Sequence, residues 1–312
     1  MQPNPVLRDL GYSATDRVAV IHADDIGMCQ AGVAALDDLW NAGIVSSMAV
    51  MAACPWFPAA AEYFRAHPAA DVGLHFTLTC EWNAFRWGPV STRAPASGLI
   101  DAEGFFPRTS EASQRKGTTD AVRAELKAQL RRAQRAGIDL THVDSHMITA
   151  WHPKFLPVYL REPARRGLPP FFMRADENRP MPFVHGKRAA AAAVRISKAM
   201  ERRGAPLFDN AFIMPLENAD DRIAAAKRTL ADLPPGLTYF ILHPACDTTE
   251  LRAIAPDWRC RVADYEAFTS RDLGGFIQQS GIQVIGWRVL RDRLRGKPSS
   301  PTLLPANAGR RE

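Results

Sequence analysis

Apolar and polar positions follow two alternating patterns along almost the whole chain, and these patterns predict strands that alternate with helices. Short apolar runs bounded by Gly, Pro or Asp are typical of buried parallel strands, and apolar residues spaced three or four apart are typical of amphipathic helices. The predicted strands are Val18 to Asp25, Ser46 to Met51, Asp71 to Thr79, Asp139 to His146, Phe171 to Arg174, Leu207 to Met214, Leu237 to Leu242 and Ile282 to Ile285. The predicted helices are Gln30 to Asn41, Pro58 to Ala66, Thr119 to Ala136, Pro153 to Arg166, Lys187 to Arg203, Ala219 to Leu230 and Val262 to Gln279.

This order of elements predicts an α/β fold. About seven strand–helix units favour a distorted (β/α) TIM-like barrel of parallel strands over a flat sheet. The 312 residues, 46% of them hydrophobic, are enough to bury such a core. Because no linker or internal repeat interrupts the pattern, we expect a single domain over residues 1–295. The Pro-, Arg- and Gly-containing end, residues 296–312, is expected to be disordered.

One long segment, Cys80 to Thr118, interrupts the alternation of strands and helices after the third predicted strand. It carries five aromatic residues among Gly and Pro, namely Trp82, Phe85, Trp87, Phe105 and Phe106. A connection of this length in a compact domain is usually functional. It is either a lid that faces the substrate, with Trp82 and Trp87 as binding residues, or a hydrophobic cluster that covers one end of the core. The two interpretations are compatible.

Charge and cysteine content narrow the classes of partner and compartment. The net charge is +6, but the excess is scattered Arg on predicted helices and in the tail, so we expect no nucleic-acid partner. Five cysteines without a CxxC pair argue against a disulfide scaffold and indicate a reducing compartment, which predicts a cytoplasmic protein. No segment approaches 18 uninterrupted apolar residues, so no membrane span is expected. A homo-oligomer is compatible with the sequence.

The first predicted strand ends in two adjacent carboxylates, Asp24 and Asp25, followed by a glycine. In parallel α/β folds, ligands and catalytic groups lie at the carboxyl ends of the strands. Neighbouring side chains on a strand point in opposite directions, so we expect the two acids to have different roles, one binding a metal and the other acting as a base. The alternative is that Asp25 caps the next helix and Asp24 is a turn residue.

Ionisable residues also end other predicted strands, although a buried parallel strand should read as an apolar run. His75 ends the third strand, His243 follows the strand from Leu237, and alternation on the fourth strand puts His142, Asp144 and His146 on one face. A lone histidine at such a position is usually structural. The recurrence at several strand ends predicts that these groups converge at one mouth of the barrel.

One carboxylate and two imidazoles form an open ligand set suited to a catalytic divalent ion. Asp25, His75 and His146 are the predicted ligands, and the ion is Zn²⁺ or Mg²⁺. His142 or Asp144 is expected to orient one of the ligands. A buried structural histidine is the alternative for His142.

The remaining groups suit amide hydrolysis. An ion with open positions acidifies a water and polarises a carbonyl. Asp24 would accept the proton of the water, and His243 would protonate the leaving amine as general acid. Arg174, at another strand end, would brace Asp24 or hold substrate, with a salt bridge as the alternative interpretation.

With these residues in place, the chain resembles the YdjC-like carbohydrate deacetylase family, which includes the chitooligosaccharide deacetylases and the hopanoid-associated deacetylases. The resemblance spans residues from about 18 to 290 in matching order. Four segments carry it: His22-Ala23-Asp24-Asp25-Ile26-Gly27, Gly73-Leu74-His75-Phe76-Thr77-Leu78-Thr79, Thr141-His142-Val143-Asp144-Ser145-His146 and Leu242-His243-Pro244-Ala245.

The resemblance implies a distorted (β/α) barrel and metal-dependent removal of an acetyl group from an N-acetylated sugar. It implies Asp25, His75 and His146 as ligands, Asp24 as base and His243 as acid. His22 stands where the family more often has Asn, and the segment after His146 also departs, so the substrate stays open between chitooligosaccharide-like and glycolipid-linked sugars. A glycosidase that uses two carboxylates, or a non-catalytic carbohydrate-binding barrel, is the alternative function.

Overall fold

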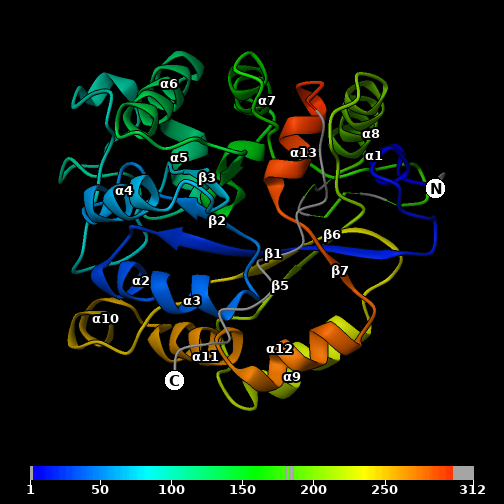
Figure 1. Ribbon diagram of the computed structural model, residues 1–312. Helices are drawn as coiled ribbons and strands as arrows, with labels where there is room; N and C mark the ends of the chain where they lie inside the picture. Colours follow the sequence, from blue (N-terminus) through cyan, green and yellow to red (C-terminus); the bar gives the residue numbers. More distant parts are fainter. Residues whose placement is uncertain (1–2, 180, 183, 185, 298–312) are drawn as a thin grey trace.

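The strands of the computed structural model, which describes residues 3–179, 181, 182, 184 and 186–297, form one parallel sheet that curves into a barrel (Figure 1). This confirms the predicted fold class. Of the tail predicted to be disordered, residues 298–312 lie outside the described residues. The strands are β1 (Arg17–Ile26), β2 (Ser47–Val50), β3 (Val72–Phe76), β4 (Val143–Ser145), β5 (Asn210–Ile213), β6 (Gly236–Leu242) and β7 (Gln283–Val284).

The sheet has the order β4-β3-β2-β1-β6-β5, and β7 pairs with β1. β1 is central: β7 pairs with its first half, at Val18 and Ala19, and β2 with its second half. Two single parallel bridges, Val143 to Pro170 and Met173 to Phe208, link β4 to the chain that enters β5. Backbone pairing therefore runs round a closed circuit. The sequence predicts a strand over Phe171 to Arg174. In the structure this part of the chain pairs only at Pro170 and Met173, so it forms two isolated bridges instead of a strand.

Helices surround the barrel; in the view of Figure 1, α6, α7, α8 and α13 lie above the strands and α2, α3 and α9 to α12 below them. None of the helices in the described part of the chain is long and apolar enough to cross a membrane. The α-helices are α1 (Pro5–Asp9), α2 (Gln30–Ala34), α3 (Leu36–Ala42), α4 (Phe57–Ala66), α5 (Ser110–Lys116), α6 (Thr119–Arg135), α7 (Leu156–Ala164), α8 (Lys187–Arg202), α9 (Arg222–Ala231), α10 (Thr249–Ile254), α11 (Trp258–Phe268), α12 (Arg271–Gln279) and α13 (Trp287–Leu294), and the 3₁₀ helices are η1 (Pro95–Ser97) and η2 (His146–Trp151).

Two predicted helices are each divided in the structure. The one predicted over Val262 to Gln279 consists of α11 and α12, because the Ser270 hydroxyl accepts the N–H of Leu273 and starts a new helix. The one predicted over Gln30 to Asn41 is divided at Ala35 into α2 and α3. Gly43, with φ of 65°, ends α3 as the sequence indicates.

The interior of the barrel holds a layer of buried aromatic rings. The His142 ring stacks on Trp287, with centroids 4.6 Å apart and an angle of 8° between the planes. Phe208 and Tyr239 contact the same Trp287 ring. Gly73 of β3 leaves the space that His142 occupies: a Cβ atom at Gly73 would lie 2.4 to 2.5 Å from atoms of the imidazole. The glycine in the third predicted strand is thus explained by the histidine before β4.

Gly73→Ala is expected to lower the free energy of unfolding by about 1–3 kcal/mol, because the added methyl group overfills this layer. Urea denaturation followed by circular dichroism measures the change. Gly275→Ala in α12 is the matched control, since nothing lies within 4 Å of the added carbon. It should stabilise the helix by about 0.5–1 kcal/mol. Equal stability of Gly73→Ala and wild type would mean that His142 moves freely.

Candidate active site

A cavity of about 410 Å³ opens where the strands end at their carboxyl side. The polar residues that line it come from six parts of the chain, as the sequence predicts for a converging mouth. They are Asp24 and Asp25 near the end of β1, His75 of β3, Glu81, Asp144, Ser145 and His146 around the end of β4, Tyr239 of β6 and His243 just after it, and Asp257 and Arg261 around the start of α11.

Asp24 and Asp25 both line this cavity, although neighbours on a regular strand point in opposite directions. The reason is local: Asp25 has φ of 64°, in the left-handed region, and the pairing of β1 with β2 shifts register between Ala23 and Ile26. The two acids nevertheless have different partners. The helix-cap alternative for Asp25 does not hold, because α2 begins at Gln30, its N-cap residue is Cys29, and no side chain caps it.

Asp25, His75 and His146 bring three ligand atoms together. Asp25 Oδ1 lies 3.4 Å from His75 Nε2 and 3.2 Å from His146 Nδ1, and the two nitrogens are 3.3 Å apart. Ligand atoms bound to one ion at about 2.0–2.2 Å are themselves roughly 3–3.5 Å apart. Asp25 Oδ1 is buried without a hydrogen bond in the described residues. The donor set and its spacing therefore fit a divalent cation.

Each of the three residues is held by a partner on its other polar atom. His75 Nδ1 donates to Asp144 Oδ1 at 2.7 Å, so Nε2 is the nitrogen that can offer a lone pair to a cation in the cluster. His146 Nε2 lies 3.1 Å from both oxygens of Glu81, which leaves Nδ1 free in the same way. Asp25 Oδ2 accepts from Arg261 at 2.8 Å. Such contacts fix the tautomer and orientation of a metal ligand.

Sequence reasoning missed Glu81 and Arg261. Glu81 follows directly after the predicted strand that contains His75, so the signal that found the other residues, a polar side chain at a strand end, applies to it too. Arg261 lies inside α11, and nothing in its sequence context indicates the site. Asp257 fixes it with two contacts of 3.0 Å, and its guanidinium lies over the Trp82 ring, 5.3 Å from the centroid.

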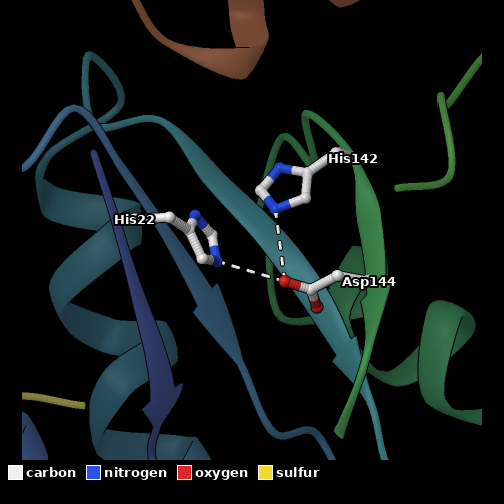
Figure 2. Close-up of side chains that lie close together, drawn as sticks. All are labelled: His22, His142 and Asp144. Atoms are coloured by element: carbon white, nitrogen blue, oxygen red, sulfur yellow. Dashed lines mark ion pairs between the residues drawn. The ribbon is translucent and has the colours of Figure 1, made fainter. Parts of the chain in front are cut away.

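A buried polar network adjoins the cluster through Asp144, which contacts His75; Figure 2 shows three residues of this network. His22 and His142 approach the same oxygen of Asp144, at 3.1 Å and 3.8 Å. Tyr239 donates to that oxygen at 2.9 Å. His22 Nε2 also lies 2.9 Å from Asp24 Oδ1, so it connects the predicted base with the carboxylate that orients His75. In this geometry Asp144 orients a candidate ligand directly, and His142 lies behind it.

The two histidines of this network carry different charges. Burial acts to lower the pKa of His22, but contacts with the carboxylates of Asp144 and Asp24 raise it to about 9. Burial lowers the pKa of His142 well below its usual value, and the charge on His22 adds to the effect. Burial acts to raise the pKa of Asp144, but His75 and His22 hold it well below its usual range. At pH 7, His22 is a cation, His142 is neutral and Asp144 is a carboxylate.

The charges around the cluster favour a cation at its centre. Burial acts to lower the pKa values of His75 and His146, yet the carboxylates that face them raise both. Burial acts to raise the pKa of Asp25, but His146 and Arg261 hold it well below its usual range. Positive charge is therefore stabilised here, either as protons on the imidazoles or as a metal ion that replaces them.

His243 reaches the cavity beside Asp24. Its Nε2 lies 4.0 Å from Asp24 Oδ2, and its backbone N–H donates to Asp264 at 2.9 Å. Burial lowers its pKa, so the imidazole is neutral at pH 7. Its Nδ1 is buried with no hydrogen bond in the part of the chain that the structure describes.

The three predicted substrate-binding residues lie in different surroundings. Trp82 lines the cavity, whereas Trp87 packs against Trp82 and donates its indole N–H to the Thr79 carbonyl at 2.8 Å. Both tryptophans are buried, which fits the packing interpretation for these two side chains, and Trp82 with Glu81 also supplies part of the cavity wall. Arg174 pairs with Asp209 at 2.7 Å and Glu201 at 2.6 Å, which matches the salt-bridge alternative.

The chain after His146 has a strained backbone. Met147 and Ile148 have φ of 52° and 54°, in the left-handed region. This conformation costs non-glycine residues about 1–2 kcal/mol each, and it is rarest for β-branched residues such as Ile. Both side chains line the cavity.

The fold and site define a class: parallel (β/α) barrels with an Asp-His-His cluster in a cavity at the carboxyl ends of the strands. The chain belongs to the YdjC-like protein family, whose model matches residues 18–279. A carbohydrate deacetylase from Thermus thermophilus is 30% identical over 282 residues, which cover 89% of this chain and 95% of that protein. A chitooligosaccharide deacetylase from Yersinia enterocolitica is 31% identical over 146 residues, 46% of this chain and 54% of that protein.

A solved structure supports the same fold. The crystal structure of a putative cellobiose-phosphate cleavage protein from Enterococcus faecalis has a TM-score of 0.70 and 21% identity, and the match covers 88% of this chain and 99% of that one. The likeness concerns the fold alone. The family resemblance and the barrel predicted from the sequence are confirmed.

Proposed function

We propose that this protein is a metal-dependent deacetylase that hydrolyses the N-acetyl group of an N-acetylated sugar, either chitooligosaccharide-like or glycolipid-linked. The observation that carries the proposal is the convergence of Asp25, His75 and His146, with ligand atoms 3.2 to 3.4 Å apart, in a chain of the YdjC-like family. The relatives named carbohydrate deacetylase support the reaction and the substrate class.

The proposed ligands are Asp25, His75 and His146, and the ion is Zn²⁺ or Mg²⁺. Two imidazoles favour Zn²⁺ and related transition metals, while a carboxylate with waters suits Mg²⁺. Bound there, the ion would supply Lewis acidity, polarising the amide carbonyl and making a water more acidic.

The other residues of the cavity would move protons. Asp24 Oδ1 faces His22, so Oδ2, which faces His243, is the oxygen that accepts a proton from the attacking water. The water oxygen bonds to the carbonyl carbon, and the carbon–nitrogen bond then breaks. His243 supplies a proton from Nε2 to the departing nitrogen, which leaves as the sugar amine, and the acyl group leaves as acetate. Because His243 is neutral at pH 7, the proton that Asp24 takes from the water would pass to His243 Nε2, 4.0 Å from Asp24 Oδ2, before it reaches the departing nitrogen.

The surroundings fit a small carbohydrate in a reducing compartment. Trp82 contributes an aromatic side chain to the cavity wall, and aromatic side chains are common in the walls of small-molecule sites. All five cysteines are free thiols, which supports the cytoplasm as the compartment that we propose.

Acetate release from a panel of N-acetylated sugars, with metal analysis of the same sample, tests the function. We expect acetate from at least one sugar, loss of activity with a chelator, and recovery when Zn²⁺ or Mg²⁺ is added back. Cleavage of a glycosidic bond that persists in chelator would indicate a glycosidase instead. Binding of sugars without acetate release at any metal loading would indicate a non-catalytic barrel.

A further inference from the structure

A second hollow, of about 610 Å³, is separate from the candidate active site. Its wall is formed by residues 53–55 after β2, residues 86–93, Phe105, and Arg132 of α6. Trp87 belongs to this wall, and its ring contacts Trp82, which lines the candidate active site. The two cavities share no lining residue. We call the second hollow the arginine pocket.

Positive charge converges on the arginine pocket. Arg86 and Arg93 reach it from the long connection after β3, and Arg132 reaches it from α6. Among the described residues that line it, none is an Asp or a Glu. A cleft lined by charges of one sign raises the local concentration of small ions of the opposite sign. The wall of the arginine pocket therefore favours an anionic ligand.

The charge of Arg86 is already balanced. Its side chain is only 6% exposed, and it donates to Asp101 at 2.6 Å and to Glu103 at 3.1 Å. Its guanidinium also lies 5.1 Å from the centre of the Phe105 ring. Arg86 therefore belongs to the frame of the arginine pocket and does not need a ligand.

The charges of the other two arginines are not balanced in this way. Arg93 donates to the Gly104 carbonyl at 3.4 Å, and the Arg132 guanidinium lies 5.2 Å from the centre of the Phe57 ring. Within the described part of the chain, neither guanidinium forms an ion pair with a carboxylate. Two like charges that face one hollow without a counterion repel each other, and a bound anion would remove that repulsion.

The backbone holds the arginine pocket in shape. Glu125 of α6 is fully buried, and its carboxylate accepts the backbone N–H groups of residues 90 and 91 at 2.9 Å and 2.8 Å. These contacts fix the segment to the helix that carries Arg132. A Cβ atom at Gly88 would lie 2.4 Å from Nη1 of Arg93, so the guanidinium packs directly on the glycine. Such fixed positions lower the cost of ordering the site around a ligand.

We propose that the arginine pocket binds a phosphate group through Arg93 and Arg132. The N–H groups of a guanidinium match two phosphate oxygens, and a doubly charged phosphate balances two unpaired cations. Ser91 and Thr92, which also line the arginine pocket, would offer hydroxyl donors. The ligand is inorganic phosphate or a small phosphate monoester. The inference does not rest on the proposed deacetylase function, because the two cavities are separate.

Isothermal titration calorimetry of the full chain at constant ionic strength tests the proposal. Inorganic phosphate, glucose 6-phosphate and glucose are the probes. We expect one site per chain for at least one of the two phosphate compounds and no binding of glucose. Tighter binding of inorganic phosphate would identify the free ion as the ligand, and tighter binding of glucose 6-phosphate would identify a monoester; either result supports the site.

Two variants locate the binding. Arg93→Gln and Arg132→Gln should each lower the affinity by about 10–100-fold, the effect expected when a hydrogen bond to a charged group is lost. Arg131→Gln is the matched control, because Arg131 precedes Arg132 on α6, is exposed and does not line the arginine pocket. It removes the same charge and should leave the affinity unchanged. Thermal unfolding of all three variants verifies that they are folded.

Three results would overturn the proposal. One is the absence of binding by both phosphate compounds. Another is equal affinity of the wild type and both pocket variants, which would place the phosphate elsewhere, for example on an ion in the candidate active site. The third is an equal loss of affinity in Arg131→Gln, which would reveal a general effect of net charge. None of these results bears on acetate release.

Discussion

Asp24→Asn is expected to lower kcat for acetate release by about 10²–10⁴-fold, while the protein keeps its metal. The amide has the size of the carboxylate and can remain beside His22, but it cannot accept a proton from water. Steady-state kinetics and metal analysis on the same preparation measure the two quantities.

One control variant and two contrary outcomes bound this result. Asp232→Asn alters an exposed acid that follows α9, and should leave both kcat and metal content at their wild-type values. If Asp24→Asn lost its metal, Asp24 would be a ligand rather than a base. Retention of kcat within a few-fold would mean that another group accepts the proton.

His146→Ala should abolish specific metal binding and, with it, acetate release, because it removes one of three protein ligands. Glu81→Gln should weaken metal affinity by about 10–100-fold, since it removes the charge that orients His146 but no ligand. Competition titrations against a coloured chelator measure both affinities. His67→Ala is the matched control, because His67 stacks on Tyr63 and lines none of the cavity.

The same titrations have a predicted pH dependence. The pKa values of His75 and His146 are raised in the protein without a metal, so protons compete with the ion as the pH falls. Metal affinity should therefore decrease with decreasing pH. In the titrations of the variants at one pH, a metal affinity of His146→Ala equal to that of the wild type would contradict the assignment of His146 as a ligand.

Much of the site could be predicted because strands of a parallel barrel end at one rim. Polar residues at strand ends are then neighbours in space, however far apart they are in the sequence. The pairing of His75 with Asp144 between β3 and β4 shows how directly the register produces the site. The positions of these residues required no knowledge of helix packing.

The parts that could not be predicted depend on tertiary contacts. The left-handed backbone at Asp25 turns both acids into one cavity, and a period-2 pattern cannot reveal that change. Arg261 reaches the site because α11 packs against α3, α9 and α12, which hydropathy does not show. Arg174 also ends a predicted strand, but the same rule did not identify its role, because Asp209 and Glu201 bind its guanidinium.

The contact between Arg261 and Asp25 joins residues 236 positions apart in the chain. On a ribosome, Asp25, His75 and His146 emerge well before the arginine that orients the first of them. A nascent chain at that stage carries the donor atoms but lacks the contacts from Tyr239 and Arg261. It would therefore bind ions weakly and with little selectivity. Selective loading of the proposed ion is therefore expected only after α11 has been synthesised and docked, which would make its binding one of the last steps in the maturation of the protein.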